Sequence, residues 1–187
     1  MRVLFLENHD SFSWNVIECL PVEREAVVVR DGRAAADDPR ALEGVDIVVV
    51  GPGPTDPVRA GILDVVRAAA AARVPLLGIC LGHQALGLAF GARLERSAPV
   101  HGKRSEATFG PSRLFPSIRG PQTVMRYHSL VLADVAAPLR VVATAPEGVP
   151  MAIEHTSLPM AGLQFHPDSY ATPRGRDVVA AFFGAVR

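Results

Sequence analysis

Cysteine is scarce in this chain: Cys19 and Cys80 are the only two among 187 residues. Two cysteines are too few for a disulfide framework, and free thiols predict a reducing, cytoplasmic location. The two cysteines and six histidines form no cluster with the spacing of metal ligands, so the sequence predicts neither a metal site nor another cofactor.

An excess of charge and long apolar runs are also missing. The 19 Lys and Arg residues balance the 19 Asp and Glu residues, so no basic surface points to nucleic acid as a partner. No apolar run approaches the ~20 residues of a membrane span, so no membrane association is expected. The chain has no internal repeat and no linker, and we expect one domain over residues 1–187.

Short apolar runs alternate with helical patterns in the first half of the chain. The runs that predict strands are Val3–Leu6, Ala26–Val29, Ile47–Val50 and Val74–Ile79. The helical patterns are Ser11–Leu20, with Asp10 or Ser11 as its cap, Ile62–Ala72, and a helix opening over Gln84–Phe90, while residues 31–44 predict turns and loop. This order predicts an α/β fold, an open, mostly parallel twisted sheet with helices on both faces.

The second half is richer in short strands and in Pro and Gly punctuation. The candidate strands there are Ala92–Ser97, Ala107–Phe109, Thr123–Tyr127, Leu139–Ala143, Met151–His155 and Met160–Phe165. We expect this half to add antiparallel strands to the sheet. A last helix is predicted from Arg174 or Gly175 to Ala185.

The most informative motif is a cysteine between two glycines, Gly78-Ile79-Cys80-Leu81-Gly82, set between a predicted strand and a predicted helix. This is the nucleophile-elbow pattern with sulfur in place of the serine oxygen. The flanking glycines permit a sharp turn, and the helix N-terminus favours the reactive thiolate. Cys80 is therefore predicted as a nucleophile, with a buried structural cysteine as the alternative.

A cysteine nucleophile needs a general base nearby. His166 follows the strand predicted at Met160–Phe165, so it lies at the same sheet edge as Cys80, and Asp168 stands two positions further to orient its ring. His128 is the rival base, whereas His83 should point away from the thiol.

Acyl transfer also needs donors for a developing oxyanion. The amide of Leu81, directly after Cys80, is one candidate donor. The loop Gly51-Pro52-Gly53-Pro54-Thr55 follows a predicted strand and could present others, although it could equally be a plain tight turn.

Several segments together resemble the class I glutamine amidotransferases, and most closely their glutaminase subunits of anthranilate synthase and 4-amino-4-deoxychorismate synthase. The matching segments are Asn8–Asn15, Gly51–Pro54, Gly78–Leu86, His101–Lys103, Arg126–Leu130 and Gly162–Ser169.

The resemblance implies that L-glutamine is hydrolysed through a Cys80 thioester, with His166 protonating the departing ammonia. Gly53, Pro54 and Thr55 with Leu81 would hold the oxyanion. Gln84, Ser129 and Leu130 would hold the amino-acid end of glutamine. The ammonia would pass to a chorismate-using synthase subunit in a hetero-oligomer, near Asn8–Asn15 and His101–Lys103.

Two residues depart from the family pattern. The family usually has glutamate at the position of Asp168, and the shorter side chain predicts a working but slower glutaminase. The family often has glycine at the position of Thr55, where a positive φ would be strained.

Three other interpretations stay open at this point. The same chemistry could serve a synthase that makes 2-amino-2-deoxyisochorismate. The chain could be a free-standing cysteine hydrolase of γ-glutamyl compounds, or a degenerate binding subunit, for which Asp168 is the only sequence feature in favour.

Overall fold

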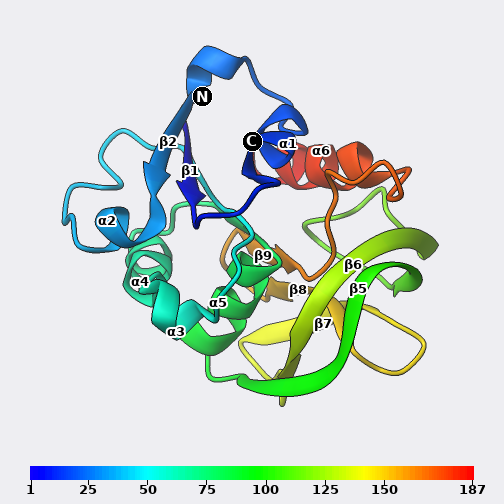
Figure 1. The fold of residues 1–187 in the computed structure, drawn as a ribbon. Helices are drawn as coiled ribbons and strands as arrows, with labels where there is room; N and C mark the ends of the chain where they lie inside the picture. The colour runs from blue at the N-terminus through cyan, green and yellow to red at the C-terminus, as the bar shows by residue number, and fades with distance from the viewer.

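The computed structural model describes all 187 residues and contains one nine-stranded sheet (Figure 1). The strands are ordered β2-β1-β3-β4-β9-β8-β7-β5-β6 across it. Their bounds are β1 Val3–Glu7, β2 Val27–Asp31, β3 Ile47–Val50, β4 Leu76–Ile79, β5 Arg93–Phe109, β6 Gly120–Ala133, β7 Leu139–Thr144, β8 Pro150–His155 and β9 Met160–Leu163.

Helices cover both faces of the parallel part of this sheet (Figure 1). Their bounds are α1 Ser13–Glu18, α2 Gly32–Ala36, α3 Pro57–Ala60, α4 Leu63–Ala71, α5 Leu81–Ala89 and α6 Gly175–Val186, with a short 3-10 turn, η1, at Arg24–Ala26. The α/β class and the mixed sheet predicted from the sequence are confirmed.

The central strands are apolar on both faces because each face has its own core. In β1, Val3 and Phe5 belong to the core under α1 and α6, whereas Leu4 and Leu6 belong to the core under α4 and α5. Burial on both sides explains why these strands are continuous apolar runs without alternation.

The strand β9 joins the two halves of the sheet. It pairs in parallel with β4, with Gly78 opposite Gly162, and antiparallel with β8. Beyond β8, the sheet ends in a long antiparallel hairpin of β5 and β6 that curls past the carboxyl ends of the parallel strands (Figure 1). The carboxyl ends of β4 and β9 therefore meet beside this hairpin.

Several element predictions are corrected by the structure. Part of the predicted loop 31–44 is the helix α2, whose first turn is capped by Asp31 accepting from the Ala34 amide. The first helix is shorter than predicted, and its N-cap residue is Phe12, without a side-chain cap. Asp10 accepts instead from the Phe12 amide, at 2.8 Å.

Three further segments differ in their bounds. The helix predicted to open at Gln84 begins at Leu81, directly after the cysteine. Strand β2 begins at Val27 because η1 occupies the residues before it. The segments Ala92–Ser97 and Ala107–Phe109 are the two ends of one strand, β5.

No helix of this structure is both long enough and apolar enough to cross a membrane.

Candidate active site

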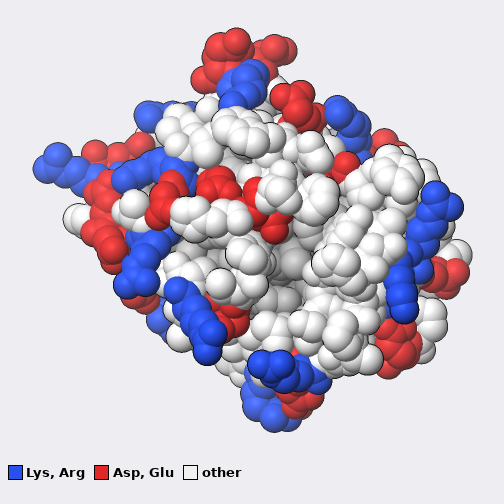
Figure 2. All heavy atoms as spheres, in the orientation of Figure 1, with Lys and Arg blue, Asp and Glu red and all other residues white.

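A cleft of about 690 Å³ opens between the carboxyl ends of the parallel strands and the β5–β6 hairpin. In the space-filling view it appears as a hollow with a largely uncharged floor, and most charged side chains lie around it (Figure 2). The predicted residues that line it are Gly53, Pro54, Thr55, Cys80, Gln84, Ser129, Leu130 and His166. Leu81 and the side chain of Asp168 are buried directly behind its wall.

Cys80 lies at the strained turn between β4 and α5. Its φ of 52° is in the left-handed region that L-residues rarely adopt, and such strain is typical of a nucleophile elbow. A Cβ on Gly78 would lie 2.3 Å from the Gly82 backbone, and one on Gly82 would lie 2.3 Å from the Val50 carbonyl oxygen. Both glycines are therefore required by close backbone approach, as the motif predicted.

Backbone hydrogen bonds hold this turn in place. The Cys80 amide donates to the Leu163 carbonyl of β9 at 2.8 Å, and the Gln84 amide donates to the Cys80 carbonyl at 3.1 Å. The thiol is thereby fixed at the N-terminus of α5, where the first amides of the helix have no acceptor within it.

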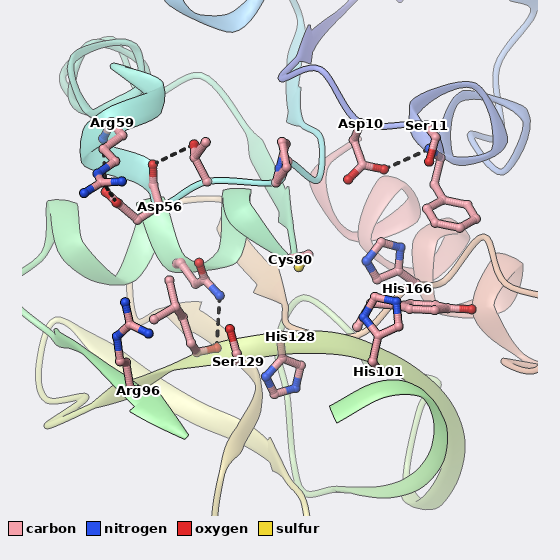
Figure 3. A pocket seen from close by; sticks show the side chains of 17 residues that line it. Asp10, Ser11, Asp56, Arg59, Cys80, Arg96, His101, His128, Ser129 and His166 are labelled. Atoms are coloured by element: carbon pink, nitrogen blue, oxygen red, sulfur yellow. Dashed lines mark hydrogen bonds and ion pairs between the residues drawn. The ribbon is translucent and has the colours of Figure 1, made fainter. Parts of the chain in front are cut away.

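His166 reaches the cleft from the segment after β9, beside Cys80 (Figure 3). Its backbone is fixed at two points: its amide donates to the Met125 carbonyl of β6 at 3.0 Å, and its carbonyl accepts from the Thr172 hydroxyl at 2.7 Å. Asp168 approaches the ring from behind, with 3.3 Å between Nδ1 of His166 and Oδ1 of Asp168. The angles at this contact do not make it a hydrogen bond.

The charge state of His166 follows from its neighbours. Burial acts to lower the pKa of the imidazole, but its interactions with Asp168 and then with Cys80 outweigh burial and raise the pKa to about 10. The ring is therefore an imidazolium at neutral pH, and it lies between the Cys80 sulfur and the Asp168 carboxyl group. This is the arrangement of a nucleophile, a proton carrier and an orienting acid.

The rival base, His128, is in a different environment. Burial and the neighbouring Arg126 lower the pKa of His128 to about 4, and Arg126 Nε donates to its Nε2 at 3.0 Å. Its ring points away from the Cys80 sulfur in Figure 3. His128 is therefore neutral and lacks an orienting carboxylate, so the geometry favours His166 as the base.

His83 does not reach the cleft. It is completely buried where α5 packs on β9, and a Cβ on Gly162 would touch its ring. Burial lowers the pKa of His83 to about 3. The prediction that it points away from the thiol is confirmed.

The loop after β3 faces Cys80 across the cleft. It is positioned by Asn8, whose amide donates to the Gly51 carbonyl at 3.1 Å. A Cβ on Gly53 would lie 2.6 Å from the Leu81 side chain, so the loop packs directly on the start of α5. Pro52 and Pro54 have no amide hydrogen, and the Gly51 amide donates to the Leu6 carbonyl at 3.0 Å. Only Gly53 and Thr55 can therefore offer an amide to an oxyanion from this loop.

Thr55 is not strained. It is absent from the residues with positive φ, so the strain considered from the sequence does not arise and its amide remains available.

A chain of amides crosses the floor of the cleft. The Gln84 Nε2 donates to the Leu130 carbonyl at 3.1 Å and to Gln164 Oε1 at 3.3 Å, and the Gln164 Nε2 lies 3.7 Å from Cys80 Sγ. Sequence reasoning placed Gln84 and Leu130 in the site but gave Gln164 no role. Only its position two residues before His166 could have suggested one.

Aromatic rings form the wall beside His166. Tyr127 lies edge-on to the His166 ring at 5.1 Å between centroids and stacks on Phe12 at 5.5 Å. His101, on the other side, lies 5.5 Å from Tyr127. The rim also carries charged side chains, including Arg59 and Arg96 (Figure 3). These residues were not assigned to the site from the sequence.

The structure contains no group of three or more His, Cys, Asp or Glu side chains that could hold a metal ion.

Comparison with known protein families gives an almost complete match. The family profile "Glutamine amidotransferase class-I" matches residues 4–186.

Curated relatives match over most of the chain. It is 42% identical over 186 residues to anthranilate synthase component 2 of Mycobacterium tuberculosis, an alignment that covers 96% of this chain and 80% of the relative. It is 39% identical over 185 residues to aminodeoxychorismate synthase component 2 of Escherichia coli, covering 96% of this chain and 98% of that protein.

A solved structure of similar fold is a putative GMP synthase protein of Thermoplasma acidophilum. Its TM-score is 0.86 at 21% sequence identity, and the match covers 100% of this chain and 94% of that one. At this identity the likeness shows the fold alone.

Proposed function

The chain belongs to the class I glutamine amidotransferases, and on that premise we propose that it hydrolyses L-glutamine and supplies ammonia to a separate, chorismate-aminating synthase subunit. The observation that carries the proposal is that Cys80, at a strained elbow, and His166, with Asp168 behind its ring, line one cleft. We further propose that residues 1–187 form one amidotransferase domain.

The first half-reaction forms a thioester. The Cys80 thiolate attacks the side-chain carbonyl carbon of glutamine, and a C–S bond forms as the carbonyl oxygen takes up negative charge. The amides of Leu81, Gly53 and Thr55 are the donors for this oxyanion. The C–N bond then breaks, and the His166 imidazolium gives its proton to the departing nitrogen, which leaves as ammonia.

The second half-reaction releases glutamate. The neutral His166 takes a proton from water, whose oxygen attacks the thioester carbon, and the C–S bond breaks to return the thiolate. The imidazolium is thereby regenerated beside it. Asp168, behind the ring, supports the imidazolium throughout.

The amino-acid end of glutamine is proposed to bind at Gln84, Ser129 and Leu130. The Gln84 NH₂ group makes both of its hydrogen bonds to the protein. The side-chain carbonyl oxygen of Gln84 is therefore the group that can accept from a substrate in the cleft. An acceptor suits the α-ammonium of an amino acid. This supports the orientation in which the side-chain amide of glutamine points to Cys80.

The proposed partner follows from the names of the relatives, which are second components of two synthases. The two names differ in product, so we propose a chorismate-using partner without choosing between anthranilate and aminodeoxychorismate. The segments Asn8–Asn15 and His101–Lys103 supply Asp10, Phe12 and His101 to the cleft rim, where such a partner would receive ammonia. Both cysteines are free, which supports a reducing cytoplasm as the location.

The test is glutamine hydrolysis by the purified chain, alone and with a chorismate-using synthase component from the same source. We expect turnover that rises with the synthase, yields an aminated product, and vanishes in Cys80→Ser. Full turnover without any partner would instead favour the free-standing hydrolase. No turnover in either setting would favour a degenerate binding subunit.

A further inference from the structure

Gln164 is a completely buried amide that the mechanism above does not use. It follows β9 directly, and its backbone amide donates to the Met151 carbonyl of β8 at 2.9 Å. Its side chain therefore starts from a fixed backbone and points to the elbow. Its Nε2 lies 3.7 Å from Cys80 Sγ, a hydrogen-bond distance for a sulfur acceptor.

The orientation of this amide is set by its neighbours. The Leu130 carbonyl can only accept, so the group of Gln84 that faces it must be the NH₂ group. The same NH₂ group faces one end of the Gln164 amide, and this end must be the carbonyl oxygen. The remaining end, the Gln164 NH₂ group, therefore faces the sulfur.

We propose that Gln164 is a catalytic residue whose side-chain N–H donates a hydrogen bond to the Cys80 thiolate. The inference rests on the proposed function for its catalytic meaning, since it deepens the assignment of Cys80 as the nucleophile. A hydrogen bond to an ionised acceptor is stronger than one to a neutral acceptor, so the amide favours thiolate over thiol. The same bond stabilises the sulfur when it leaves the thioester in the second half-reaction.

The hydrogen-bond chain also connects substrate recognition to the nucleophile. Gln84 contacts Leu130 and Gln164, and Gln164 contacts Cys80. A substrate glutamine that binds the Gln84 side-chain amide therefore alters the orientation of the Gln164 NH₂ group, which donates to the sulfur. The chain gives the amino-acid end of the substrate a physical route to the thiolate.

The experiment measures the alkylation of Cys80 by iodoacetamide, which requires neither glutamine nor a partner. All variants carry Cys19→Ala, so that Cys80 is the only thiol. The rate is followed between about pH 4 and pH 10, a range that spans thiol and thiolate. The variants are the parent and Gln164→Met, which keeps the length of the side chain and removes the donor.

The matched control is Gln122→Met. Gln122 is another buried amide, bonded to the Arg119 carbonyl at 2.8 Å outside the cleft. We expect Gln164→Met to lower the alkylation rate about tenfold on the acidic side of the profile, the size of one lost charge-assisted bond. The plateau rate at high pH should rise severalfold, because a thiolate of higher pKa is the stronger nucleophile. The control should match the parent throughout.

A rate unchanged by Gln164→Met would overturn the proposal, as would an equal fall at every pH, which indicates altered access to the thiol. If Gln164→Met does not fold, Gln84→Met provides the second variant. It leaves Gln164 in place without its orienting partner and should lower the acidic-side rate by a smaller factor. An unchanged rate in that variant would count against the proposal.

The result separates this inference from the proposed function. If Gln164→Met lowers the alkylation rate but the parent has no glutaminase activity, the hydrogen-bond proposal stands and the proposed glutaminase function is rejected. Glutaminase activity with unchanged alkylation in both variants would do the reverse.

Discussion

The imidazole of His166 and the carboxylate of Asp168 lie 3.3 Å apart, Nδ1 to Oδ1, in a nearly completely buried pair that contacts without hydrogen-bond alignment. Pro167 separates the two residues and fixes the turn between them. The short side chain of Asp168 thus reaches the ring but does not align with it. Behind the carboxylate is a second cavity of about 320 Å³, lined also by Cys19 and Arg176.

The first prediction concerns the length of this carboxylate side chain. Asp168→Glu should leave glutaminase turnover unchanged or raise it by up to about tenfold, because an added methylene improves the alignment of the carboxylate with the ring. The cavity behind Asp168 offers room for it. The measurement is steady-state glutamine turnover in the presence of the synthase component, with Asp168→Asn as the control that should lose activity. Slower turnover in Asp168→Glu would contradict this reasoning.

The second prediction concerns the protonation of His166. Nuclear magnetic resonance of the labelled imidazole should show it protonated at neutral pH, with a pKa of about 10. Cys80→Ser should lower this pKa, because the interaction with Cys80 is one of the causes that raise it. A titration that stays in place in Cys80→Ser would show that the sulfur is not ionised in the folded protein.

The same shift predicts a pH dependence of stability. The folded pKa of His166 lies above the ordinary value of 6.5, so the folded state holds the proton more tightly than the unfolded state. This contribution is fully present below about pH 6.5 and is lost as pH rises through about 10. The free energy of unfolding, measured by denaturant titration, should therefore be higher in the parent than in His166→Gln. This difference should be largest near pH 6 and smallest near pH 10.

The third prediction concerns His83, whose two ring nitrogens are buried without hydrogen-bond partners. His83→Met should raise the free energy of unfolding by about 1 kcal/mol near pH 8, because it removes an unpaired polar group from the core. The pKa of His83 is lowered to about 3, so the parent loses stability as pH falls below about 6.5. The gain should therefore grow at pH 5. An equal gain in His101→Met, at an exposed position, would show that burial is not the cause.

The fourth prediction concerns the aromatic wall of the cleft. Phe12 lies 5.8 Å from the His166 ring and stacks on Tyr127, so it connects a proposed partner-facing segment to the base. Phe12→Ala should reduce the stimulation of glutaminase by the synthase more than it reduces the activity of the isolated chain.

The matched control for this prediction is Phe90→Ala, at a similar edge contact with His155, 4.8 Å between centroids. Both variants should be compared as the ratio of turnover with and without the synthase. If Phe12→Ala lowers turnover with and without the synthase by the same factor, the aromatic wall supports the His166 ring but does not transmit partner binding.

Sequence patterns predicted the parallel half of the sheet well. The run Ile47–Val50 matches β3 residue for residue, because a strand covered on both faces is apolar throughout. The β5–β6 hairpin was predicted only in pieces. The middle part of β5 is largely exposed, so no apolar pattern marks it. The continuity of this strand depends on its pairing with β6.

The candidate site divides in the same way. Cys80 and His166 were predictable because local motifs place each of them at the end of a strand. Gln164 was not assigned, since its role depends on contacts with Cys80 and Gln84, which are far from it in the sequence. Tyr127 likewise gains its place in the wall only when the hairpin curls over the sheet.

Strand β9 has a consequence for how the chain reaches its active form during synthesis. The last strand to leave the ribosome occupies the middle of the sheet, between β4 and β8. Until residues 160–163 arrive, β4 and β8 each present an unpaired edge, the kind of surface that promotes aggregation. His166 follows the same strand, so completion of the sheet also brings the His166 ring beside Cys80. The proposed catalytic arrangement therefore forms only when β4 and β8 have no unpaired edge.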